Sequence, residues 1–178
     1  MRRRELRPAV TAPPRWRFGL PHTMWLDNGL EVLICPREGQ HIASVCLSLD
    51  IPLDAEPSHI EGVATITQRC LDEGTIEHPG ISFSEALEDI GAVLDGSVGF
   101  SASQLFVDVP TAGLAQALNL LAEVVTEPEL ADAQVERHRE LRLADIDQTL
   151  ASSARSVQVA FRKACIPRRF RVSRMAGG

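Results

Sequence analysis

The stretch that decides the fold is Glu61-Gly62-Val63-Ala64-Thr65-Ile66-Thr67-Gln68-Arg69-Cys70-Leu71-Asp72-Glu73-Gly74-Thr75. With the preceding Ile60, its apolar residues recur at helical spacing and form one stripe, consisting of Ile60, Val63, Ile66, Cys70 and Leu71. This period predicts an amphipathic helix over residues 60–71. Gly74-Thr75 then acts as a stop signal, because glycine is common just after the last helical turn.

Strands are predicted on both sides of this helix. Upstream, Asn28-Gly29 separates a strand that begins at Thr23 from residues 30–34, and this dipeptide supplies the two positive-φ positions of a tight hairpin turn. After a second turn over 38–40, residues 42–51 alternate apolar and polar side chains, as in a half-buried strand. Downstream, residues 93–100 and 101–109 are predicted as two adjacent strands, closed by Pro110.

The remaining segments are predicted to be helical. Ser82 and Glu85 have the spacing of a capping box for a helix that ends at Gly91. A third helix has an apolar stripe and is broken by Pro128; the stripe consists of Leu114, Leu118, Leu121 and Val125. One long helix is expected over about 129–165, with an apolar side of Leu130, Leu141, Leu143, Ile146 and Leu150. The element order predicts an α+β fold, with a mainly antiparallel sheet covered by helices on one face.

Length and composition are those of one soluble globular domain. The chain has 178 residues, of which 44% are hydrophobic and 24% charged. No apolar run is long enough to span a membrane, and the start lacks an apolar signal core, so we expect a cytoplasmic protein with no membrane partner. The cysteines, Cys35, Cys46, Cys70 and Cys165, lie far apart without a Cys-x-x-Cys pair. We expect them to be buried free thiols rather than disulfides or zinc ligands.

Charge is distributed unevenly along the chain. The net charge is −6, yet residues 1–17 and 162–178 each hold 6 basic side chains, with one acidic side chain in the first segment and none in the second. Subtracting both ends leaves 6 basic and 23 acidic residues over 18–161, a net charge of −17. An acidic body argues against nucleic acid as a partner. Lys163 is the only lysine, a bias typical of GC-rich bacterial genomes.

The two ends are predicted to lie outside the folded domain. Residues 1–21 are rich in proline and arginine without periodicity, so we expect an extended arm. Residues 166–178 are predicted to be a basic, aperiodic tail, which leaves 22–165 as the domain. This tail is interpreted either as a flexible terminus or as the point where a domain is cut short, since the predicted sheet lacks an obvious final strand.

Two motifs together resemble a known family. The hairpin over residues 26–32 and the frame Gly62, Ala64, Gly74 and Thr75 are similar to the N-terminal domain of the M16 peptidases, the insulinase, pitrilysin and mitochondrial processing peptidase group. The resemblance covers residues 22–165 and implies the LuxS/MPP-like metallohydrolase fold, as an incomplete domain. In that family the frame encloses H-x-x-E-H, in which two histidines bind zinc and the glutamate is the general base. Matching the frame places Thr65 and Arg69 at the histidines, Gln68 at the base and Asp145 at a third ligand.

The residues at these positions have the wrong chemistry for zinc. A threonine hydroxyl is a poor ligand, arginine is a fixed cation, and a glutamine amide cannot take a proton. We therefore expect no catalytic residue, no metal ligand and no zinc cofactor in this chain. Asp145 is interpreted first as an exposed helix carboxylate and alternatively as a salt-bridge partner of Arg69.

The remaining titratable side chains form no recognisable site in the sequence. His138 is predicted to be solvated, and the other histidines, His22, His41, His59 and His78, stand singly in or near loops. The carboxylates of 50–61 and 72–77 are interpreted as parts of polar loops. The sequence contains no nucleophile elbow, P-loop or dinucleotide-binding motif.

The resemblance also implies a function. The peptidases of this family consist of two homologous halves that form a chamber. One half carries zinc, and the other is degenerate and helps to hold the substrate peptide. This chain resembles the degenerate half, so we expect a non-catalytic domain that supports peptide binding and proteolysis by a zinc-bearing M16 partner, or that self-associates. Arg69 would then be available to a substrate carboxylate. The alternatives are an active zinc metalloendopeptidase with a displaced site, and a vestigial or structural interaction domain.

Overall fold

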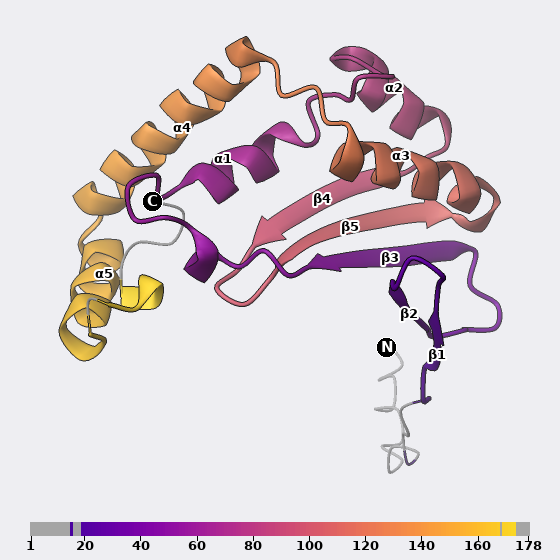
Figure 1. Ribbon diagram of the computed structural model, residues 1–178, viewed down its shortest axis with the longest axis horizontal. Helices are drawn as coiled ribbons and strands as arrows, with labels where there is room; N and C mark the ends of the chain where they lie inside the picture. Colours follow the sequence, from indigo (N-terminus) through magenta and orange to yellow (C-terminus); the bar gives the residue numbers. More distant parts are fainter. Residues whose placement is uncertain (1–14, 16–18, 168, 174–178) are drawn as a thin grey trace, which may run out of the picture. The chain divides into compact units, whose positions relative to one another are not determined.

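The computed structural model describes residues 15, 19–167 and 169–173, and the chain divides into two compact units, residues 1–40 and 41–178 (Figure 1). Most of the predicted arm over 1–21 lies outside the described residues. Among the helices of the described ranges, none is long and apolar enough to cross a membrane.

The first unit contains the predicted hairpin, formed by the antiparallel strands β1 (His22–Trp25) and β2 (Glu31–Ile34). The turn differs from the expected two-residue type, because Trp25 pairs with Glu31 and five residues connect the strands. The backbone N–H of Gly29 donates to the Leu26 carbonyl at 2.9 Å, and Gly29 has a φ of 85°. The Asn28 side chain accepts a hydrogen bond from the Leu30 N–H at 3.1 Å. Asn28 therefore acts through its side chain, and Gly29 supplies the left-handed position.

The second unit is built on a three-stranded antiparallel sheet, in the order β3-β5-β4. The strands are β3 (Ile42–Leu49), β4 (Val93–Val98) and β5 (Ser103–Pro110), which confirms the predicted strands. Along β5, Leu105, Val107 and Val109 are buried, whereas Phe106 and Asp108 face outward. The period of two thus gives the sheet one apolar inner face and one outer face.

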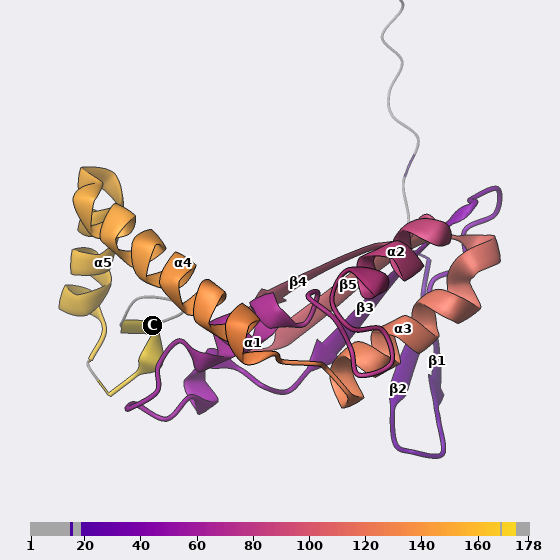
Figure 2. The same cartoon turned by 90° about the horizontal axis from the view of Figure 1, so that it is seen from above.

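Three helices lie on the inner face of this sheet (Figures 1 and 2). They are α1 (Val63–Cys70), α2 (Ile81–Asp89) and α3 (Leu114–Thr126), and the short 3-10 helices η1 (Leu53–Ala55) and η2 (Thr111–Gly113) lie in the connections. The core between helices and sheet contains Phe83, Ala92, Leu105, Val107, Val109, Ala117, Leu120, Leu121 and Val124. The α+β class with helices on one face is confirmed.

The buried sides of α1 and α3 differ in part from the predicted stripes. In α3 the buried residues are Ala117, Leu120, Leu121 and Val124, whereas the predicted Leu118 and Val125 are exposed. This helix has more apolar positions than one face can hold, so periodicity alone cannot select the buried face. Near α1, Cys70 is buried as predicted, but Ile60 and Val63 are exposed.

Helix α2 ends as predicted and begins differently. Gly91 has a φ of 65°, and the N–H groups of Gly91 and Ala92 donate to the carbonyls of Glu88 and Leu87 at 2.9 Å, which is a Schellman motif. The predicted capping box is wrong, because Gly80 is the N-cap and Ser82 lies inside the helix. The Ser82 hydroxyl instead donates to the Pro79 carbonyl at 2.8 Å.

The predicted long helix is in fact two helices, α4 (Asp132–Ala151) and α5 (Ser153–Cys165). Ser152 is extended, with φ −84° and ψ 117°, and the Ser156 hydroxyl donates to the Leu150 carbonyl at 2.6 Å. Serine hydroxyls compete with the helical backbone in this way, which explains a break without glycine or proline. The predicted apolar side is also wrong, since Leu130, Leu141, Leu143 and Leu150 are exposed and only Ile146 is half-buried.

Candidate functional site

Helix α1, which carries the candidate site, is held at its N-terminus by a carboxylate from the preceding loop. Glu56 Oε1 accepts hydrogen bonds from the backbone N–H groups of Gly62 at 3.1 Å and Ala64 at 2.9 Å. Gly62, the N-cap, has a φ of 101°, which favours glycine. The first N–H groups of a helix lack internal partners, so this carboxylate satisfies two of them and complements the helix dipole.

Arg171 pairs with the same carboxylate from a segment 115 positions later. Its Nε and Nη2 lie 3.2 and 3.1 Å from Glu56 Oε2, and both side chains are only 3% exposed. Arg171 belongs to the 3-10 helix η3 (Arg171–Ser173), so the predicted aperiodic tail is wrong for these residues, while residues 168 and 174–178 lie outside the described ranges. Glu56 lies in a loop, as interpreted, but its carboxylate is buried and paired.

The Gly74-Thr75 pair fixes the chain after α1. Gly74 has a φ of 151°, and a Cβ there would lie 2.5 Å from the backbone nitrogen of Gly80. Thr75 is fully buried, and its hydroxyl accepts from the His78 N–H at 2.9 Å and donates to Glu123 Oε2 at 3.1 Å. His78 Nδ1 lies 2.8 Å from the same carboxylate, so this histidine is not isolated as predicted. The motif's Gly-Thr pair is therefore structural.

Between these two anchors, α1 presents Thr65, Gln68 and Arg69, all half-buried. Their spacing of three and four places them on one side of the helix. α1 packs against α4 and β4, so this side is bounded by a helix that is distant in sequence and by a strand of the sheet.

Arg69 and Asp145 form an ion pair between α1 and α4, with Nη2 2.8 Å from Oδ2. The side chains are 37% and 44% exposed. The sequence left this contact as the alternative to an exposed carboxylate, and the structure contains it. Arg142 lies near the pair, and burial lowers its pKa, opposed by the charge of Asp145. The region between α1 and α4 is therefore rich in guanidinium groups.

Gln68 lies over the sheet beside a shallow cleft of about 130 Å³. The cleft is lined by Gln68, Arg69, Leu71, Asp72, Leu94, Asp95, Gly96 and Leu105. Burial raises the pKa of Asp72, and the charge of Glu73 adds to this effect. The cleft thus combines the Gln68 amide, one guanidinium and two carboxylates.

The residues of this site do not fit zinc. Arg69, which the resemblance matches to a ligand, is a permanent cation, and it is already paired with Asp145, which the same resemblance matches to the third ligand. The Thr65 hydroxyl and the Gln68 amide supply no thiolate, imidazole or carboxylate. Within residues 15, 19–167 and 169–173, no three histidine, cysteine or carboxylate side chains are grouped so that they could hold a metal ion.

Next to the site, Glu73 connects the end of α1 with α4. Glu73 Oε1 lies 2.7 Å from His138 Nε2 and also contacts Arg137 Nη2. Burial alone raises the pKa of Glu73, but the hydrogen bonds from His138 and Arg137 outweigh it, so the pKa is lowered. The prediction that His138 is solvated is wrong, because its ring is buried and its Nδ1 has no hydrogen-bond partner within the described residues. The weak apolar period of α4 gave no signal for this burial.

The cysteines form no reactive centre. Cys70 is the buried one, and burial raises the pKa of its thiol, with Glu73 and Asp72 adding to the effect, so little thiolate is present at neutral pH. The expectation of buried thiols is wrong for the other three, Cys35, Cys46 and Cys165, which are exposed. All four are free thiols.

An antiparallel sheet with helices on one face, and a helix α1 whose Arg69 pairs with an acidic residue of α4, define an α+β domain. The chain belongs to the insulinase family, peptidase family M16, whose family model matches residues 32–166.

The chain is also similar to subunit 1 of the mitochondrial cytochrome b-c1 complex. It is 25% identical over 127 residues to the protein from Homo sapiens, covering 71% of this chain and 26% of that one. The protein from Bos taurus is 25% identical over 123 residues, covering 69% and 25%. The chain spans about a quarter of the length of these relatives.

Solved structures show the same fold. A peptidase M16 inactive domain from Pseudomonas fluorescens superposes with a TM-score of 0.82 at 18% identity, covering 89% of this chain and 38% of that one. Pitrilysin superposes with a TM-score of 0.74 at 21% identity, covering 89% and 17%. These likenesses confirm the predicted fold class.

Proposed function

We propose that this chain is a non-catalytic domain of the M16 family that supports peptide binding and proteolysis by a zinc-bearing homologue. The observation that carries the proposal is the Arg69–Asp145 ion pair, at the two positions matched to the second histidine and the third ligand. An internal ion pair in place of a metal removes the Lewis acid and the activated water together. The helix frame is kept while the chemistry is lost.

The similar proteins support this assignment in part. One of the solved structures is described as an inactive peptidase M16 domain, and the curated relatives are subunits of the cytochrome b-c1 complex. The first is consistent with a non-catalytic M16 domain, and the second with a domain that contributes beside other chains. The partner proposed for this chain is a zinc-bearing M16 homologue.

In such a complex we assign Arg69 the role of binding a carboxylate of the peptide. Its guanidinium is partly exposed at the cleft, and a guanidinium has five N–H donors in a plane, so it can bind a second carboxylate beside Asp145. The neighbouring Gln68 amide offers a donor and an acceptor to the peptide backbone.

The first experiment tests catalysis and metal binding by the chain alone. The purified protein is dialysed against zinc, its metal content is measured, and cleavage of a peptide library is followed. We expect no bound zinc and no cleavage. Stoichiometric zinc or turnover by the chain alone would overturn the proposal in favour of a displaced active site.

The second experiment tests the supporting role. A zinc-bearing M16 homologue, preferably one encoded beside this chain, is assayed with and without it, and complex formation is followed by sedimentation. We expect a defined complex and faster cleavage. Arg69→Gln should raise KM for peptides with acidic residues and leave complex formation unchanged, whereas Arg139→Gln, which alters an exposed pair on α4, should change neither. A chain that neither binds the homologue nor changes its rate would count against the role.

A further inference from the structure

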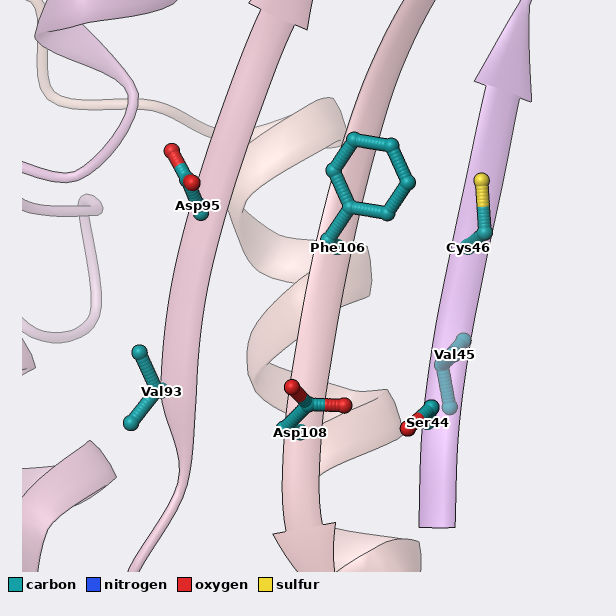
Figure 3. A pocket seen from close by; sticks show the side chains of 7 residues that line it. All are labelled: Ser44, Val45, Cys46, Val93, Asp95, Phe106 and Asp108. Atoms are coloured by element: carbon teal, nitrogen blue, oxygen red, sulfur yellow. The ribbon is translucent and has the colours of Figure 1, made fainter.

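The outer face of the sheet is an exposed surface that shares only Asp95 with the lining of the candidate cleft. We define the outer face by six residues, Ser44, Cys46, Val93, Asp95, Phe106 and Asp108, which line a groove of about 340 Å³ together with Val45. Figure 3 shows these residues on β3, β4 and β5, with a helix passing behind the strands. The cleft beside Gln68 includes Leu94 and Leu105, whose side chains belong to the opposite face of the sheet.

The outer face combines apolar and acidic side chains. Val93 is 65% exposed and Phe106 is 39% exposed. In the register of the sheet, Phe106 pairs with Asp95 and with Cys46, and Asp108 pairs with Val93. Phe106 therefore lies on the central strand, with one carboxylate opposite it and one two residues further along β5. Exposed apolar side chains next to charged ones on a flat sheet are typical of a surface that binds a partner.

Helix α5 has the complementary composition. Val157 and Phe161, four residues apart and hence on one side of the helix, are 65% and 66% exposed. The helix contains three basic residues, Arg155, Arg162 and Lys163, and no acidic one. It packs against α4 and η3 rather than lying over the core helices (Figure 1). An amphipathic basic helix with an exposed aromatic residue is suited to an apolar surface with carboxylates.

We propose that the outer face binds helix α5 of a second copy of this chain. Phe161 and Val157 of one copy would cover Phe106 and Val93 of the other, while the long basic side chains beside them reach Asp95 and Asp108. Two such contacts related by a twofold axis close a dimer. The contact is centred on Phe106, across the sheet from Leu94 and Leu105 of the candidate cleft, and it meets the cleft only at Asp95. It requires no zinc-bearing homologue.

Sedimentation equilibrium with charge reversal tests this contact. We expect the wild-type chain to dimerise, and Asp95→Arg with Asp108→Arg to weaken dimerisation at least about tenfold, because like charges then face each other. Arg162→Glu with Lys163→Glu should weaken it similarly, and an equimolar mixture of the two double variants should associate again. Glu85→Arg with Glu88→Arg on α2 makes the same change of charge elsewhere and should have no effect.

Two native cysteines allow the contact to be located. Cys46 lies on the outer face and Cys165 at the end of α5, and both are exposed free thiols. In a Cys35→Ser background, where Cys70 is buried, a short bismaleimide should join Cys46 of one copy to Cys165 of another, and peptide mass spectrometry should identify that link. A monomer at all concentrations, a dimer linked through other positions, or charge-reversed variants that fail to associate when mixed would overturn the proposal.

Discussion

Gln68 occupies the space that a side chain at Gly96 would need. A Cβ built on Gly96 would lie 1.8 Å from Gln68 Nε2 and 2.7 Å from its Cδ. The absence of a side chain on β4 thus allows the amide of α1 to lie directly on the strand. The glycine and the glutamine form one packing unit, although 28 positions separate them.

This relationship predicts coupling between the two residues. Gly96→Ala should destabilise the protein when Gln68 is present, because the amide must leave its position over the strand. In a Gln68→Ala background the same change should cost less, because only Leu105 Cδ2, 3.0 Å from a Cβ at Gly96, still has to shift. The preference for alanine over glycine within a strand, about 0.5–1 kcal/mol, offsets part of that cost. Urea unfolding of the four proteins gives a coupling free energy expected to be about 1 kcal/mol. Additive effects would show that Gln68 does not lie over Gly96.

Restoring the family's ligands should create a zinc site on this scaffold. The variant Thr65→His, Gln68→Glu, Arg69→His and Asp145→Glu provides two imidazoles and a carboxylate on α1 and a second carboxylate on α4. We expect zinc binding, measured by calorimetry, even if turnover does not appear. A control that carries Thr67→His in place of Thr65→His has the same added groups, but Thr67 is exposed. Equal binding by both proteins would contradict the proposed arrangement.

Breaking the buried ion pair between Glu56 and Arg171 should lower the stability of the folded protein. Removal of one partner leaves the other charge buried and unpaired, so Arg171→Met should lower the free energy of unfolding by about 3–5 kcal/mol. The double variant Glu56→Gln with Arg171→Met should recover part of this loss, because Gln can still accept from the N–H groups of α1. Urea unfolding provides the values, and Arg139→Met, at an exposed pair, is the matched control. A loss in Arg171→Met no larger than the control's would contradict this account.

Glu73 should contribute a pH-dependent part of the stability. Its pKa is lower in the folded protein than its ordinary value of 4.5, so the stabilisation is complete well above that pH and is lost as the pH falls through the folded value. Glu73→Gln should therefore cost about 1.5–3 kcal/mol at neutral pH, the usual worth of a hydrogen bond to a charged group. The difference from wild type should shrink below about pH 4.5. Glu77→Gln, which removes an exposed carboxylate four residues away, is the matched control.

Local patterns in the sequence predict much of the fold. The alternation in β3 and β5, the Asn28-Gly29 hairpin and the stop at Gly91 are properties of short segments, and each appears where the sequence indicates. The apolar side of α4 could not be predicted, because this helix carries charges on every side and one buried histidine. Its division at Ser152 depends on a hydroxyl–carbonyl contact with no distinctive sequence pattern.

The partners within the site depend on contacts between distant segments. The sequence alone allows a motif to be aligned with Thr65, Gln68, Arg69 and Asp145. It left two interpretations of Asp145, an exposed carboxylate or a partner of Arg69, and the structure contains the second. The burial of Glu56 and the position of His138 had no such signal, since a carboxylate in a loop and a histidine in a polar helix are usually solvated. These contacts join residues 65 to 115 positions apart, a separation at which local periodicity carries no information.

The contact between Glu56 and Arg171 also has a consequence for the order in which the protein can assemble during synthesis. The ribosome completes α1 long before it reaches Arg171. The Glu56 carboxylate at the start of this helix therefore emerges without its arginine partner. That carboxylate can remain in water only while the surrounding loop stays open. The first half of the domain is therefore expected to wait in a partly open state until η3 has been translated, and a chain stalled before Arg171 would be a natural target for proteases and chaperones.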